Sequence, residues 1–333
     1  MNSINVTTFY VQNSGNLQIW TNTPSDVERI DFSCYKFQQG ADIMPRYLFF
    51  FNLESRGQKY ILSKLSLHSD YGYFLKDMKV GKDFCPPAIS VDKSRFHNVL
   101  ISNILTPFNI GSCPKALLPI KRDGEGKWAD LEDVDMLSLG RPLKAFFDQT
   151  KNTYICYKGK NIKSLYDVLN VYNKLGKQRI PIGSFIVVYG AGGSKTCAAY
   201  MKVEEEVVID QTIYYYIADT EDEAIFMTAL LNSNSIEKVN AAYQAQGQFG
   251  KRHIHTLPAE TLPAFDGDNY YHIELVSITK ALIGSLNKKI TSDKLDPNNR
   301  PVATRRRAIN EVLVGLPEYE QYEELCMKII TLS

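Results

Sequence analysis

Two short apolar runs and a helical repeat follow one another after residue 206. Residues 207–209 and 213–217 are β-branched and aromatic, a composition that favours β-strands. Beyond them, Thr220 and Glu223 have the spacing of a helix capping box. Apolar residues then recur at the spacing of one helix face: Ala224, Met227, Leu230 and Leu231. The pattern predicts two strands and a helix that begins after Thr220.

A break and a second helix come next. Asn232-Ser-Asn-Ser interrupts the repeat, and Asn234 with Glu237 forms a second capping pair for a helix that ends near Gly247. The turn that follows, Gly-Gln-Phe-Gly-Lys-Arg-His-Ile-His, has two glycines around one aromatic residue. Glycines let a backbone approach a partner closely, and positive charges suit an anionic partner. A helix C-cap followed by a basic loop explains the same residues. The candidate contacts in this turn are Lys251, Arg252, His253 and His255.

Similar patterns predict the remaining elements. Residues 1–62 look β-rich, with a hairpin of residues 6–10 and 17–20 and a buried strand entered through Pro45. Residues 99–105 fit either a helix or a strand. Helices are predicted at residues 130–147, 271–290 and 319–330, and also from the triple arginine Arg305-Arg306-Arg307 onward. Together these elements predict an α+β fold with mixed sheets in two lobes and helices at the C-terminal end.

The charge pattern divides the chain near residues 148–160. Residues 151–179 hold seven Lys or Arg, one acid and four tyrosines, whereas residues 201–223 hold eight acids and one lysine. Lysines neutralise phosphates and tyrosines stack on bases, so Lys158, Lys160 and Lys163 are candidate DNA contacts. A solvated basic helix face is the alternative. We expect a β-rich lobe at 1–150, a second α/β lobe with this basic patch at 151–268, and a helical segment at 269–333.

Composition narrows the class of protein. The 333 residues are 44% hydrophobic and 23% charged, with a net charge of +1, so any nucleic-acid surface must be a local patch. There is no apolar run long enough to span a membrane and no signal-peptide pattern. The six cysteines form no Cys-x-x-Cys pair, which argues against a zinc ribbon. These features predict a cytoplasmic protein without a membrane partner.

One glycine-rich loop invites a phosphate-binding interpretation. Gly190-Ala-Gly-Gly-Ser-Lys-Thr196 follows a strand-like run at residues 185–189. A Walker A loop needs Gly-x-x-x-x-Gly-Lys-Ser/Thr and opens a helix, whereas here the glycine spacing differs and a strand follows. We therefore interpret Ser194, Lys195 and Thr196 as the tip of a hairpin that contacts DNA.

Several of these stretches carry a family resemblance. The Glu-Ala…Leu-Leu-Asn-Ser helix, the Gly-Gln-Phe-Gly-Lys-Arg-His-Ile-His turn and the following Leu-Pro…Phe-Asp resemble the C-terminal half of adenine DNA methyltransferases of restriction–modification systems, of the type IIG and type ISP kind. That half carries the target recognition domain, which selects the DNA sequence. The family often has a Gly-Ala…Pro-Arg stretch, which makes Arg46 a candidate for phosphate or base contact; pairing of Arg46 inside the core explains it equally well.

The catalytic motifs of such an enzyme are missing. Amino-methylating enzymes need an Asp/Asn-Pro-Pro-Tyr/Phe loop around the flipped base, and the only Pro-Pro here is Cys85-Pro86-Pro87-Ala88. No glycine loop for S-adenosylmethionine, no nuclease acid–lysine cluster and no nucleophile elbow occurs. We therefore expect no enzyme activity, metal or cofactor in this chain alone, with S-adenosylmethionine in a separate catalytic domain.

The sequence thus predicts a module that recognises double-stranded DNA for an adenine DNA methyltransferase. Its partners would be DNA and the methyltransferase catalytic domain or subunit, with the chain being an excised fragment or a split subunit. The alternative is a protein–protein docking or scaffold subunit of a restriction–modification complex, in which the basic patch contacts an acidic partner. Sequence-selective, salt-dependent binding to duplex DNA would distinguish the two.

Overall fold

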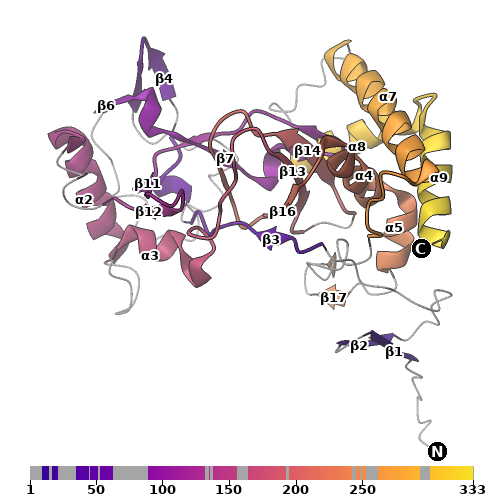
Figure 1. The fold of residues 1–333 in the computed structure, drawn as a ribbon. Helices are drawn as coiled ribbons and strands as arrows, with labels where there is room; N and C mark the ends of the chain where they lie inside the picture. Colours follow the sequence, from indigo (N-terminus) through magenta and orange to yellow (C-terminus); the bar gives the residue numbers. More distant parts are fainter. Residues whose placement is uncertain are drawn as a thin grey trace, which may run out of the picture.

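The computed structural model describes residues 10–14, 17–21, 35–44, 46–51, 53–62, 89–131, 135, 138–155, 164–192, 195–241, 245–247, 250–252, 262–292 and 301–332. The fold is α+β, as the sequence predicts. Figure 1 shows helices gathered at one end, small sheets and further helices at the other end, and an antiparallel sheet between them.

The sheet in the middle contains two of the strands that apolar runs predict, at residues 185–190 and 213–218. Its order is β14 (Ala198–Lys202), β13 (Phe185–Gly190), β16 (Ile213–Ala218) and β3 (Gln38–Gln39). All three pairings are antiparallel, and Val187 lies between Tyr200 and Tyr216. Because neighbouring residues of a strand point to opposite faces, β13 contributes to two cores. Ile186 and Val188 pack in one hydrophobic cluster, and Val187 and Tyr189 pack in the other.

Helices cover one face of this sheet. In α4 (Glu221–Asn232) every residue from Glu223 to Leu231 is buried, since the helix lies between β13–β14 and α7 (Tyr270–Ser292). Thr220 caps α4 as predicted, with its hydroxyl accepting a hydrogen bond from the Glu223 N–H at 3.1 Å. The other helices at this end are α5 (Asn234–Ala241), α8 (Val302–Val314) and α9 (Tyr319–Leu332).

Small sheets and two helices surround the other core. A three-stranded sheet combines β10 (Lys115–Ala116), β7 (His97–Leu100) and β15 (Val207–Ile209), with β15 parallel to β7. A second sheet holds β4 (Leu53–Arg56), β5 (Lys59–Leu62) and β6 (Ile89–Asp92). Two further pairs are β8 (Leu105–Thr106) with β9 (Asn109–Ile110), and β11 (Ile120–Arg122) with β12 (Trp128–Asp130). The helices here are α2 (Arg141–Ile155) and α3 (Leu165–Leu169).

Two separate hairpins complete the strands that the structure describes. They are β1 (Tyr10–Ser14) with β2 (Leu17–Thr21), and β17 (Ala245–Gly247) with β18 (Gly250–Arg252). No helix in the described parts of the chain is long and apolar enough to cross a membrane.

Several predicted boundaries are wrong. The described part of the first hairpin strand is Tyr10–Ser14, which extends beyond the predicted end at residue 10 and pairs with Leu17–Thr21, whereas residues 6–9 lie outside the described residues. The predicted buried strand after Pro45 is a 3-10 helix, Arg46–Leu48, followed by a single bridge from Phe50 to Ala116. Of the helix predicted at 130–147, Asp130 belongs to strand β12, Asp135 and Ser138 are helical, and α2 begins at Arg141.

The break between α4 and α5 also differs in detail. Ser233 rather than Asn234 caps α5, with its hydroxyl accepting from the Ile236 N–H at 3.2 Å. The α5 helix ends at Ala241 rather than near Gly247, which instead ends strand β17.

Candidate nucleic-acid interface

The turn between β13 and β14 presents Lys195 at the surface. Gly190 donates a backbone hydrogen bond to Cys197 at 3.1 Å, and Tyr189 pairs with Ala198, so residues 191–196 connect the two strands. The glycine-rich stretch therefore joins two antiparallel strands, as expected. The Lys195 side chain is exposed, and its ammonium lies 2.8 Å from Glu237 on α5. The turn thus lies beside the start of α5.

Asn232 fixes the end of α4 against the same strands. Its side-chain amide donates to the Ala198 carbonyl at 2.8 Å and accepts from the Ala198 N–H at 2.9 Å. It also donates to the Thr228 carbonyl within its own helix at 3.0 Å. An amide side chain pairs here with a backbone amide as a neighbouring strand would. This pairing explains why the polar break falls at residue 232.

A groove of about 790 Å³ lies between this turn, the α4–α5 break and helices α8 and α9. Phe108 and Tyr322 form part of its apolar floor, with their rings in edge contact at 5.8 Å. Two acids, Glu237 and Glu311, also line it. The amides and cations that line it are Lys195, Asn232, Asn234, Arg306, Arg307 and Asn310. Arginine and asparagine are the side chains that most often read base edges, and cations anchor phosphates.

The polar side chains of the groove differ in whether they already make hydrogen bonds within the protein. Arg306 donates to the backbone carbonyls of Leu105 at 3.0 Å and Ser102 at 2.8 Å, so it is committed to holding α8. Arg307, the next residue, is exposed to solvent. Burial, reinforced by Glu323, raises the pKa of Tyr319 to about 12, so its hydroxyl remains a neutral donor. Burial also raises the pKa of Cys197 to about 11, which makes its thiol a poor nucleophile.

The basic hairpin, formed by β17 and β18 and carrying Lys251 and Arg252, lies close to this groove along the chain. Strand β17 begins at Ala245, four residues after α5 ends at Ala241. Four residues span at most about 14 Å, so the hairpin lies near the end of α5. In Figure 1, β17 is drawn below α5. Lys251 and Arg252 belong to β18, opposite Gln246 and Ala245, and their side chains are outside the described residues.

Arg46 lies in the interior rather than at this surface. It is 6% exposed, and its Nη2 is 2.8 Å from Asp210 Oδ1. Of the two roles that the sequence allows for Arg46, the structure contains the core pairing. The remaining predicted contacts lie outside the described residues: Lys158, Lys160, Lys163, Ser194, His253 and His255.

Two amides of the groove, Asn232 and Asn310, were not among the DNA contacts predicted from the sequence. The Asn-Ser-Asn-Ser stretch predicted only a helix break, although a break with several amides beside a basic turn is a signal for a polar surface. The triple arginine predicted only the start of a helix. The structure instead places Arg305 and Arg306 on the backbone carbonyls of residues 102–105.

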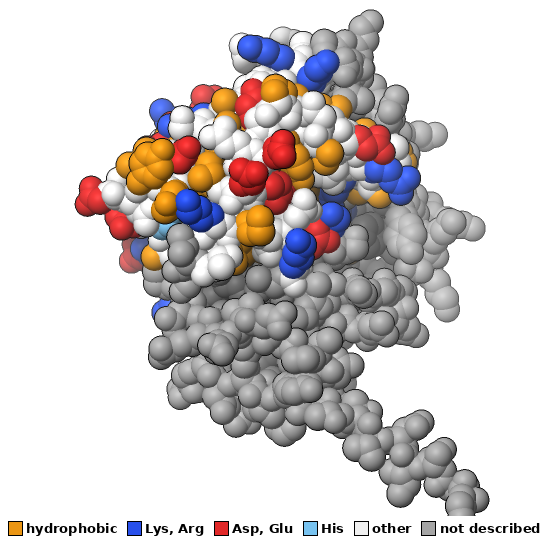
Figure 2. All heavy atoms as spheres, turned by 90° about the vertical axis from the view of Figure 1, so that its right-hand side faces the viewer, with side chains coloured by type: hydrophobic (Ala, Val, Ile, Leu, Met, Phe, Trp, Pro, Cys, Tyr) orange, Lys and Arg blue, Asp and Glu red, His pale blue; other side chains and the backbone are white. Residues whose placement is uncertain are grey.

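The outer face of the helical end carries mixed charge. Figure 2 looks onto the right-hand side of Figure 1, where α7 and α9 lie, and shows acidic and basic side chains interspersed with apolar ones. Among the exposed apolar residues are Tyr270 and Ile273 on α7 and Met327 on α9. A surface of mixed sign does not attract a polyanion as a uniformly basic one does.

Comparisons with known proteins show the fold. No protein-family model and no curated protein sequence matches the chain. The type IIL restriction-modification enzyme MmeI, solved in complex with DNA, matches with a TM-score of 0.53 over 96% of this chain and 37% of that chain, at 9% identity. The type IIG restriction endonuclease BpuSI gives a TM-score of 0.38 over 90% of this chain and 30% of that chain, at 12% identity. The chain spans little more than a third of the length of MmeI, and its fold is that of part of a restriction–modification enzyme.

Proposed function

We propose that this chain is the target recognition module of a restriction–modification enzyme and binds double-stranded DNA with sequence preference. The observation that carries the proposal is the match of 96% of the chain to MmeI, an enzyme solved in complex with DNA. The sequence resemblance to the recognition half of adenine DNA methyltransferases supports the same role. Fold likeness alone does not define a function, so the site must supply the chemistry.

The groove and the basic hairpin suit complementary parts of a duplex. A two-stranded ribbon such as β17–β18 has the dimensions that the major groove of B-DNA admits. Lys251 and Arg252 lie on that ribbon, where they would read guanine edges or hold phosphates. Lys195 and Arg307 at the groove would anchor the backbone, and Asn234 and Asn310 offer amide groups to bases.

Methyl transfer and its cofactor would belong to a separate part of the enzyme. The sequence lacks the loop that surrounds a flipped adenine, so S-adenosylmethionine and the reaction are assigned to a catalytic domain or subunit that partners this chain. The present chain would position the duplex for that partner, in the cytoplasm where such enzymes meet DNA.

The test is selection from a randomised duplex pool at two salt concentrations, with sequencing of the bound fraction. We expect an enriched short motif and an affinity that falls as salt rises, because each neutralised phosphate releases counterions. The double variant Lys251→Ala/Arg252→Ala should lose the motif. Lys288→Ala/Lys289→Ala, which changes two adjacent exposed lysines of α7, is the matched control and should retain it.

The other results have definite meanings. Salt-sensitive binding without a motif would reduce the proposal to a non-specific grip on the DNA backbone. Absence of binding by the folded chain would overturn DNA recognition by this module.

A protein-docking role is the second candidate. The exposed Tyr270, Ile273 and Met327 on the helical end favour it, because apolar side chains at a mixed-charge surface suit a protein partner better than DNA. If Tyr270→Ser/Ile273→Ser abolishes binding to a methyltransferase subunit while duplex selection fails, docking is the function.

A further inference from the structure

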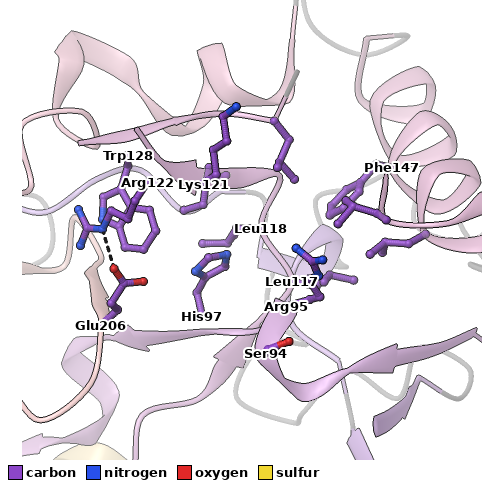
Figure 3. Close-up of a pocket in the computed structure, with 14 residues that line it drawn as sticks. Ser94, Arg95, His97, Leu117, Leu118, Lys121, Arg122, Trp128, Phe147 and Glu206 are labelled. Atoms are coloured by element: carbon purple, nitrogen blue, oxygen red, sulfur yellow. Dashed lines mark hydrogen bonds and ion pairs between the residues drawn. The ribbon is translucent and has the colours of Figure 1, made fainter. Parts of the chain in front are cut away.

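A second cavity lies in the other lobe, away from the groove. It has a volume of about 180 Å³ and is formed by β7, β11–β12 and the start of α2. Figure 3 shows Trp128 and His97 on one side and Phe147 on the other, with Leu117 and Leu118 among the apolar groups that line it. Pockets for drug-sized ligands start at about 300 Å³, so this cavity suits a ligand of one ring or two fused rings.

His97 gives the cavity a polar group for which the described residues supply no hydrogen-bond partner. The imidazole meets the Trp128 ring edge-on, with centroids 5.2 Å apart, and has no hydrogen-bond partner among the described residues. Trp128 Nε1 is also buried without a partner there. Buried polar groups in native proteins are nearly always paired, so unused ones in a cavity wall indicate a missing partner. Burial and Arg122 lower the pKa of His97 to about 4, so at neutral pH its ring both donates and accepts.

The rim carries one positive charge without an acid beside it. Lys121 pairs with Asp135 at 2.6 Å, and Arg122, stacked 3.5 Å from the Trp128 ring centroid, pairs with Glu206 at 3.2 Å. Arg95 is exposed, lines the cavity and has no ion-pair partner in the described part of the chain. Asp135 and Glu206 are therefore each paired with a cation, and Arg95 is left to pair with the negative group of a ligand.

We propose that this cavity binds a small planar ring that carries one negative group. The ring fills the apolar space beside Trp128 and Phe147, a polar ring atom bonds to His97, and the negative group pairs with Arg95. Aromatic carboxylates and nucleobases carried on a phosphate share this chemistry. The proposal does not depend on the DNA-recognition role of the other lobe.

The full chain contains two tryptophans, so Trp20→Phe leaves Trp128 as the only indole and its emission as the reporter. The probes are benzoate and nicotinate as carboxylates, deoxyadenosine and deoxycytidine monophosphates as nucleotides, and benzamide as the neutral match of benzoate. We expect a saturable change in Trp128 emission with one of the two anionic classes, carboxylates or nucleotides. The class that produces it identifies the source of the ring. If benzoate is the ligand, benzamide should bind roughly tenfold more weakly, as expected when one charged hydrogen bond is lost.

Two variants locate the binding. In the same background, Arg95→Ala and His97→Phe should each weaken binding by roughly tenfold, the effect of losing one hydrogen bond to a charged or buried partner. Arg56→Ala, which changes an exposed arginine of β4 that does not line the cavity, is the matched control and should leave binding unchanged. Because Arg95 is exposed, its loss should not disturb folding, and circular dichroism verifies this.

Two results would overturn the proposal. One is the absence of any saturable change in Trp128 emission with all four anionic probes. The other is binding that neither Arg95→Ala nor His97→Phe weakens, since that would place the ligand elsewhere.

Discussion

Arg46 and Asp210 join two distant parts of the chain inside the protein. Besides Arg46, Asp210 Oδ1 accepts hydrogen bonds from the Thr212 N–H at 3.0 Å and the Thr212 hydroxyl at 2.6 Å. The backbone is close here too, since a Cβ on Gly40 would lie 2.2 Å from the Asp210 carbonyl oxygen. Only glycine fits at that position. The pair therefore holds the 3-10 helix at residue 46 against the turn between β15 and β16.

Removal of either side chain of the Arg46–Asp210 pair should destabilise the folded protein. Arg46→Met leaves the Asp210 carboxylate buried without its cation, which we expect to lower the free energy of unfolding by about 3 to 5 kcal/mol. Urea unfolding measures it. Asp210→Asn keeps an acceptor for Thr212 and removes the charge, so the double variant should cost less than the two single variants added. Unchanged stability of Arg46→Met, together with weaker DNA binding, would show that Arg46 acts on DNA instead.

His97 should make stability depend on pH in mild acid. Its folded pKa of about 4 lies below the ordinary histidine value of 6.5, so between these two pH values the unfolded chain binds the extra proton. Stability from His97 is complete above pH 6.5 and falls as the pH drops toward 4, by up to about 1.4 kcal/mol per pH unit. The measurement is urea unfolding across this range. His97→Phe should flatten the slope relative to the parent, and an unchanged slope would assign it to other groups.

At the scale of elements, α8 is attached to the opposite lobe by arginines. Arg306 reaches the carbonyls of Ser102 and Leu105, and Arg305 bonds to the carbonyl of Asn103, which together cover the 3-10 turn before β8. A charged donor on a backbone carbonyl is stronger than a neutral one. The helix is therefore held to β8 by side chains as well as by apolar packing.

Arg306 and its neighbour Arg307 should separate stability from binding. Arg306→Ala removes two charged hydrogen bonds, and we expect a loss of roughly 2 to 4 kcal/mol in unfolding free energy. Arg307→Ala changes an exposed side chain on the same helix and should stay within about 0.5 kcal/mol of the parent. In duplex binding, Arg307→Ala should weaken the affinity at low salt. Equal stability of the two variants would contradict the attachment.

Sequence patterns predicted the helices and strands that are determined by residues close together in the chain. Strand 213–218 and helix 270–292 follow from composition and period, and the hairpin tip at Lys195 follows from its glycines. The strand predicted after Pro45, at residues 46–51, is wrong because an apolar run does not distinguish a strand from a buried 3-10 turn. Their burial comes from a distant partner, as in the 2.9 Å bond from the Leu117 N–H to the Phe49 carbonyl.

The candidate site was less predictable than the fold. Its groove combines residues near 195, 232 and 306, and no sequence spacing shows that three such distant segments meet. Arg46 shows the same limit, because its partner lies 164 positions away. The basic stretches were visible in sequence, but which cations face solvent and which hold carbonyls is decided by long-range packing.

At the scale of the whole molecule, the two cores share one sheet. Residues Ile186 and Val188 belong to one core and Val187 and Tyr189 to the other, so β13 cannot leave one core without leaving both. Residues on both sides of position 150, such as Phe146 and Val208, also pack in the same cluster. The division at 1–150, 151–268 and 269–333 stays a prediction about sequence, whereas this packing implies one cooperative unit.

Cooperative unfolding is testable from opposite ends. Leu282→Ala in α7 removes a fully buried side chain of the helical core and should lower stability by about 2 to 5 kcal/mol. In the Trp20→Phe background, Trp128 emission reports from the other core. We expect its urea midpoint to shift by the same amount as the helical circular dichroism signal, because a shared strand transmits the loss to both cores. A Trp128 transition that stays at the parent midpoint while the helices unfold earlier would show two independent domains.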